Sequence, residues 1–229
     1  MIQNTNNKII LACQFLSAHL EEAQRIMGTE IPVIELDTSL HEFPEKMREK
    51  ILEEISKIPK EYDTILVGMG FCGGSWGDVR CDRKVVIPRI DDCISILLTL
   101  TDEWKANLKK PGCMYQTDNR NNNMTIPGMR ENMLEKYGEV KGKVLFDIMF
   151  DSYSKIGIID TGAYDSFSEE NEDLARRSAE LIGGTVEHIP GSNRILEKLV
   201  SGRWDDQFMI LEPGETMREW DLFPDAKPN

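Results

Sequence analysis

Three cysteines of this chain come directly after apolar runs that are typical of buried strands. They are Cys13 at the end of the run 8–13, Cys72 after the run 64–70, and Cys93 after the run 84–88. The carboxyl ends of parallel strands face one crevice, and open α/β sheets bind ligands there. Thiolates are the soft ligands that zinc, nickel, cobalt and iron–sulfur clusters accept. The sequence therefore predicts that the three thiols meet at a site for one such metal ion or for a cluster.

The same cysteines have a simpler interpretation. Free cysteine is among the most buried residue types and packs as a small hydrophobe. A non-catalytic binding module with packed cysteines is therefore one alternative function. Cys81, within a charged run, and Cys113, beside a loop, are weaker candidates for a fourth ligand.

A glycine-rich stretch surrounds Cys72. Gly68, Gly70 and Gly73 fit the pattern G-x-G-x-x-G after a strand, and Gly74 follows. A dinucleotide site also needs a helix that opens at the third glycine, but no apolar periodicity follows here. We therefore expect Gly70, Gly73 and Gly74 to let the backbone approach a group held at Cys72.

A second alternative is an enzyme without a cofactor. Cys93 follows Arg89 and Asp92 at the expected start of a helix. Arg89 and the helix dipole would lower the pKa of the thiol, whereas the carboxylates would raise it. Cys93, Arg89 and Asp92 are thus candidate catalytic residues, with Cys93 as a nucleophile for a small polar substrate.

The last third of the chain repeats the opening order of strands and helices. Asp160 and Gly162 occupy the position that corresponds to Cys13, at the end of a strand. A carboxylate and a turn glycine suit a small polar ligand, so both are candidate binding residues. We expect them to face the first half across a cleft.

Apolar runs and helical spacings alternate along the chain, which predicts an α/β fold. We expect Rossmann-like parallel sheets with helices on both faces and two pseudo-equivalent β-α-β-α-β halves. The expected division is an N-terminal half at 1–110, a connecting loop and helices at 111–152, a C-terminal half at 153–217, and a loosely ordered tail at 218–229. The two halves can form one domain.

The net charge and the lengths of the apolar runs argue against some classes of partner. The 229 residues carry a formal net charge of −13, which argues against nucleic acid, because phosphates need a basic patch. No apolar run is long enough to span a membrane, and the first residues lack the features of a signal peptide. We expect a cytoplasmic protein with reduced thiols. The helical segment 126–152 is compatible with a homodimer.

Several motifs together resemble a family catalogued as domain of unknown function 1638. The resemblance covers most of the chain and rests on Ile10–Cys13, Gly68–Gly73, Ile87–Cys93, Ile159–Gly162, Pro190–Glu197 and Gly202–Asp206. Cys13, Cys72 and Cys93 belong to this pattern, whereas Cys81 and Cys113 lie outside it. The chain departs from the family in the stretch 113–129, where it is rich in asparagine.

The resemblance implies an accessory protein of anaerobes and methanogens. Some members are encoded beside corrinoid-dependent methyltransferase systems, which implies a corrinoid or methyltransferase protein as a partner. It also implies that the three thiols act together. We therefore expect a metal- or iron–sulfur-binding protein, accessory to corrinoid, one-carbon or metal metabolism.

Overall fold

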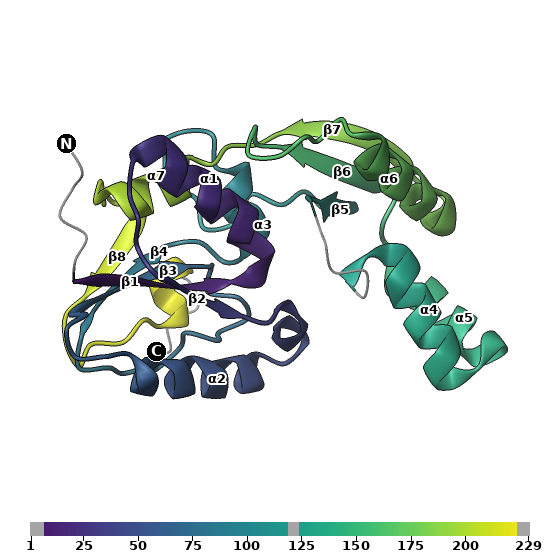
Figure 1. Ribbon diagram of the computed structural model, residues 1–229. Coiled ribbons are helices and arrows are strands. Elements are labelled where there is room, and N and C mark those ends of the chain that lie inside the picture. The colour runs from purple at the N-terminus through teal and green to yellow at the C-terminus, as the bar shows by residue number, and fades with distance from the viewer. Residues whose placement is uncertain (1–6, 119–123, 224–229) are drawn as a thin grey trace. The chain divides into compact units, whose positions relative to one another are not determined.

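The computed structural model of the protein describes residues 7–118 and 124–223 (Figure 1). The chain divides into two compact units. Unit 1 combines the residues up to Leu108 with those from Ser192 onward, and unit 2 comprises Lys109–Gly191. Unit 1 is therefore built from two separate stretches of the chain. Asn119–Asn123, where the chain departs from the family pattern, lie outside the described residues.

A five-stranded sheet forms the centre of unit 1. Its strands, in spatial order, are β2 (Val33–Leu36), β1 (Lys8–Cys13), β3 (Thr64–Gly68), β4 (Lys84–Pro88) and β8 (Phe208–Leu211). The first four are parallel, and β8 pairs antiparallel with β4. β3 is buried along its whole length. Burial on both faces explains its continuous apolar sequence.

Helices cover both faces of this sheet. α1 (Ser17–Met27) and α7 (Arg194–Ser201) pack against each other on one face, and α2 (Pro44–Lys57) covers the opposite face (Figure 1). Pro44 lies in the first turn of α2, where a missing N–H costs nothing. α1 ends at Gly28, which has a φ of +63°. The expected Rossmann-like arrangement is confirmed.

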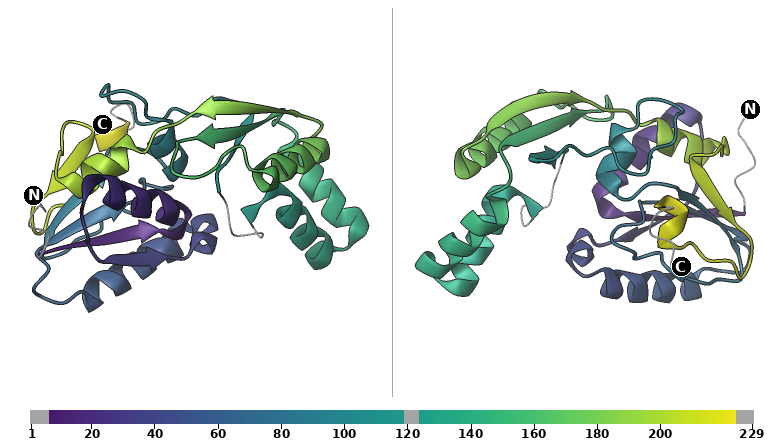
Figure 2. Two further views of the ribbon diagram at one scale, coloured as in Figure 1. Left: turned by 45° about the horizontal axis from the view of Figure 1, so that its top comes forward. Right: turned by 180° about the vertical axis from the view of Figure 1, so that it is seen from behind.

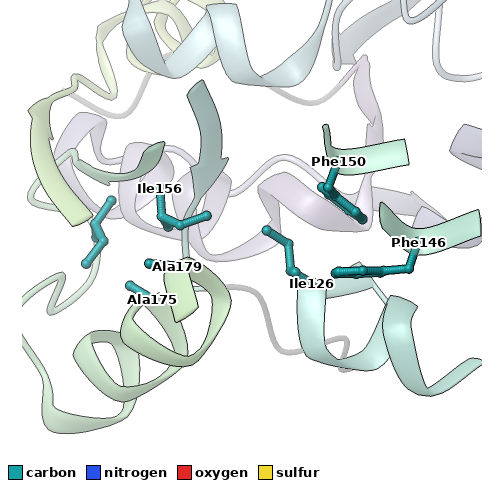
Figure 3. Close-up of a cluster of buried hydrophobic side chains, with 7 residues drawn as sticks. Ile126, Phe146, Phe150, Ile156, Ala175 and Ala179 are labelled. Atoms are coloured by element: carbon teal, nitrogen blue, oxygen red, sulfur yellow. The ribbon is translucent and has the colours of Figure 1, made fainter. Parts of the chain in front are cut away.

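Unit 2 contains a smaller parallel sheet. Its strands are β5 (Cys113–Gln116), β6 (Lys155–Asp160) and β7 (Thr185–Pro190), in that order. α6 (Glu169–Ile182) packs on this sheet, and α4 (Ile126–Tyr137) forms a hairpin with α5 (Glu139–Phe150) (Figure 2). The buried side chains that join these elements are Ile126, Phe146, Phe150, Ile156, Ile158, Ala175 and Ala179 (Figure 3).

The last third of the chain differs from the expected second half. Strand β8 does not join β6 and β7 but forms the edge of the sheet in unit 1, where Val85 pairs with Leu211. Phe208 and Leu211 are buried there, whereas Ile210 is exposed. Residues 192–217, which we expected in a C-terminal half, accordingly belong to unit 1. Within the described residues, the sheet of unit 1 has five strands and that of unit 2 has three.

A buried ammonium group fixes this returning segment. Lys198 on α7 binds the carboxylates of Asp102 and Asp205 and donates a hydrogen bond to Oε1 of Gln207 at 2.8 Å. A buried charge is tolerated only when it is paired. The residues that lead into β8 are thereby tied to α7.

The expected tail also contains structure. Residues 219–222 form the short helix α8 (Glu219–Leu222), and Leu222 is buried. Asp221 accepts a hydrogen bond from the backbone N–H of Arg218, which caps the helix. Part of the expected tail is thus helical, and 224–229 lie outside the described part of the chain.

His19 on α1 is buried and gives a testable dependence of stability on pH. Burial lowers the pKa of His19 to about 4. The unfolded chain, with a histidine pKa of about 6.5, binds the proton first, so stability is full above that value and falls as the pH drops towards 4. We expect a loss of about 2 kcal/mol between pH 7 and pH 5.

The measurement is urea unfolding at pH 7 and pH 5 for the wild type and His19→Gln. Glutamine does not titrate, so the variant should lose about 2 kcal/mol less than the wild type on acidification, whatever its stability at pH 7. An equal loss in both proteins would show that His19 does not contribute. The carboxylates with lowered pKa, such as Asp102, lose their contribution only at lower pH.

Candidate functional site

Cys13, Cys72 and Cys93 lie at the carboxyl ends of three adjacent parallel strands. Cys13 is the last residue of β1, Cys72 follows β3, and Cys93 follows β4 and opens the short helix α3 (Cys93–Leu98). All three are buried, with at most 6% of their surface exposed. The strand-end rule therefore placed the three cysteines correctly in one region of unit 1.

The three thiols form a chain with Cys93 in the middle. The Sγ atoms of Cys72 and Cys93 are 3.8 Å apart. The thiol of Cys13 lies close enough to that of Cys93 for each to shift the pKa of the other. Cys93 therefore interacts with both other thiols, and the three form one cluster.

The glycine-rich loop places Cys72 beside Cys93. The N–H groups of Phe71 and Cys72 donate to the carbonyls of Ile90 and Asp91 at 2.9 and 2.6 Å. Gly70 permits this approach, because a Cβ there would lie 2.5 Å from Cα of Asp92. The two loops that follow β3 and β4 are thus in direct backbone contact.

The backbone then turns sharply. Cys72 has a φ of +46°, and Gly73 and Gly74 have φ values of +66° and +89°. A left-handed conformation is unusual for cysteine and marks a constrained position. No helix begins at Gly73, so the loop lacks the helix start of a dinucleotide site.

Arg48 on α2 is a supporting residue that the sequence did not indicate. Its guanidinium donates a hydrogen bond to the carbonyl of Gly74 at 2.7 Å. It occurs within an ordinary charged helix, so no local signal could have revealed this contact. The loop is therefore anchored to the helix that covers the sheet.

Burial and mutual contact keep two of the thiols protonated. Interaction with the thiol of Cys93, followed by burial, raises the pKa of Cys13 far above its ordinary value. Interaction with Cys13 lowers the pKa of Cys93, but contact with Cys72 and burial outweigh it, so the pKa lies well above the ordinary value. Both groups are thiols at neutral pH and are poor nucleophiles in this state.

Arg89 and Asp92 have other partners. The guanidinium of Arg89 donates to the carbonyls of Asp206 and Asp221 and lies over the ring of Trp104, 4.1 Å from its centroid. Asp92 accepts a hydrogen bond from the N–H of Ser95 at 2.9 Å and so caps α3. The expected lowering of the Cys93 pKa by Arg89 is therefore not what the structure shows.

Asp160 and Gly162 belong to unit 2. Asp160 ends β6, and its carboxylate accepts a hydrogen bond from the N–H of Gly162 at 3.4 Å. Gly162 has a φ of +72°. Their observed contacts are those of a turn closed by an aspartate side chain.

The other candidate features are built from other residues. Cys81 is half-buried and its thiol contacts the carbonyl of Arg83, while Cys113 opens β5 in unit 2. A cavity of about 810 Å³ in unit 2 has no cysteine in its lining, which is Glu169, Glu170, Glu172, Asp173, Arg176 and Val186. Among the described residues, no group of three or more His, Cys, Asp or Glu side chains is placed to hold a metal ion.

Comparison with known proteins gives a family. The fold is of the α/β class, with a mostly parallel sheet in unit 1 and a parallel sheet in unit 2. The sequence profile described as "Protein of unknown function (DUF1638)" matches residues 35–200, so the chain belongs to this family. No curated protein and no solved structure matches the chain. No helix in the described residues has the length and apolar character needed to cross a membrane.

Proposed function

We propose that Cys13, Cys72 and Cys93 form a thiolate site that binds a metal ion or an iron–sulfur cluster. The observation that carries the proposal is the convergence of three buried sulfurs on the carboxyl ends of β1, β3 and β4. Convergence at this edge of a parallel sheet is the arrangement that ligand sites of α/β proteins use. The role would be that of a cytoplasmic accessory protein in corrinoid, one-carbon or metal metabolism, as the family resemblance suggests.

The donor set fits a single ion best. Two thiolates that each lie about 2.3 Å from one tetrahedral ion are about 3.8 Å from each other. The Sγ atoms of Cys72 and Cys93 already have this separation. Thiolates on different irons of a cubane cluster lie farther apart, so the distance favours zinc, nickel or cobalt over such a cluster.

Binding on all three sulfurs requires two changes in the residues. The thiols of Cys13 and Cys93 must lose their protons, and side chains must rotate, because the three groups are not yet placed around one point. Three protein ligands leave one coordination position open, where a bound ion can polarise a substrate or activate water. The loop 70–74 would shield the site from solvent.

The protonated state of Cys93 favours this proposal over a cysteine nucleophile. A reactive cysteine needs a lowered pKa and some exposure. The pKa of Cys93 is raised, only 4% of its surface is exposed, and Arg89 contacts backbone carbonyls elsewhere. A metal supplies the missing charge, because coordination deprotonates a thiol directly.

The test is purification under strict exclusion of oxygen, followed by elemental analysis and an absorption spectrum of the same sample. We expect about one zinc, nickel or cobalt per chain. Iron with sulfide and visible absorption would assign the site to a cluster instead. A protein that is free of metal and takes up none from zinc, cobalt, nickel or iron–sulfide solutions would refute the proposal and leave the packed-cysteine binding module.

A further inference from the structure

Helix α5 carries a second apolar face that is largely exposed among the described residues. One face of the helix packs into the core through Gly142, Phe146 and Phe150. On the opposite face, Val140 is 82% exposed, Val144 51% and Ile148 69%. Apolar residues on both faces are typical of a helix that is buried on both sides. An exposed apolar stripe of this kind marks an interaction surface.

The three exposed residues are spaced four apart and so form one continuous stripe along the helix. One edge of the stripe carries an ion pair between Nζ of Lys143 and Oδ2 of Asp147, 2.8 Å apart. Both side chains are more than half exposed. Along the chain, the positive charge of Lys143 thus precedes Val144, the centre of the stripe, and the negative charge of Asp147 follows it.

This arrangement is complementary to itself. A two-fold axis through Val144 would place Val140 of one copy level with Ile148 of the other. The same rotation brings the edge with Lys143 and Asp147 in one copy next to the same edge of the other copy. Lys143 of one copy would then lie within one helical turn of Asp147 of the other. Two copies related in this way bury the stripe and pair the opposite charges, as isologous interfaces do.

We propose that α5 is the interface of an antiparallel homodimer centred on Val144. The helix has 12 residues and is about 18 Å long, so the buried area is small for a stable dimer. We therefore expect a dissociation constant on the order of 10 µM. The inference does not depend on the thiolate site.

The first test is sedimentation of the full chain from about 1 to 100 µM, a range that spans the expected dissociation constant. The wild type should change from monomer to dimer, and Val144→Asp should weaken the dimer at least tenfold, because it buries charge at the centre. Leu52→Asp is the matched control, since Leu52 is also an exposed apolar residue within a helix, α2. It should leave the dissociation constant unchanged.

Reversal of the edge charges tests the orientation. Lys143→Glu should weaken the dimer by placing two carboxylates together, and the double variant Lys143→Glu/Asp147→Lys should restore it. Circular dichroism checks that each variant is folded. A wild type that stays monomeric at 100 µM, a dimer that Val144→Asp does not change, or a double variant as weak as Lys143→Glu would overturn the proposal.

Discussion

Replacement of Cys93 by alanine is expected to abolish metal binding. The sulfur of Cys93 contacts that of Cys72, and its thiol also interacts with that of Cys13, so its loss removes the donor that links the other two. The metal content should fall from about one ion per chain to less than about a tenth. The fold should persist, because the deletion of one buried sulfur costs on the order of 1 kcal/mol.

Two variants serve as controls for this loss. Cys113 is as buried as Cys72 but lies on β5 in unit 2, and Cys81 contacts Arg83 in unit 1. Cys113→Ala and Cys81→Ala should keep the full metal content measured in the same preparation. If Cys93→Ala kept its metal, or if the control variants lost theirs to the same degree, the three-thiol site would be wrong.

The substitution Gly70→Ala is expected to have the largest effect on stability. A Cβ at this position would lie 2.5, 2.6 and 2.7 Å from Cα, C and N of Asp92. All three are backbone atoms that cannot rotate away, so the loops after β3 and β4 must separate. We expect a loss of about 3–5 kcal/mol in the free energy of unfolding, measured with urea.

The control for this variant is Gly28→Ala. A Cβ at Gly28 would meet nothing within 4 Å, although the φ of +63° is unfavourable for alanine. That variant should cost only about 1–2 kcal/mol. If Gly70→Ala cost no more than the control, the close contact between the two loops would not be a real constraint.

The strands of the site could be predicted from the sequence, because a strand that is buried on both faces has a continuous apolar sequence. β1 and β3 are continuous apolar runs, and a parallel strand between helices needs such a run. Once the strands are parallel, their carboxyl ends must lie at one edge of the sheet. The common location of Cys13, Cys72 and Cys93 follows from topology alone, without any knowledge of side-chain positions.

The contacts within the site could not be predicted in the same way. The position of Cys72 depends on its left-handed backbone and on the approach of Gly70 to Asp92. Arg89 binds the carbonyl of Asp206, which is 117 residues away along the chain. These interactions depend on the tertiary fold, so local sequence patterns do not predict them.

The sheet that strand β8 joins could not be predicted from the sequence either. Its four residues match the pattern of a parallel strand in the second half equally well. Pairing with β4 decides its place, and the bonds of Lys198 to Asp205 and Gln207 hold the segment before it. The periodicity of a short strand does not specify which sheet it joins.

X-ray absorption at the K edge of the bound metal tests the central claim most directly. The sample is wild-type protein purified without oxygen, with Cys93→Ala as the comparison. We expect three sulfur neighbours at about 2.3 Å in the wild type and no ordered sulfur shell in the variant. A wild-type shell of nitrogen and oxygen ligands alone would contradict a site built from Cys13, Cys72 and Cys93.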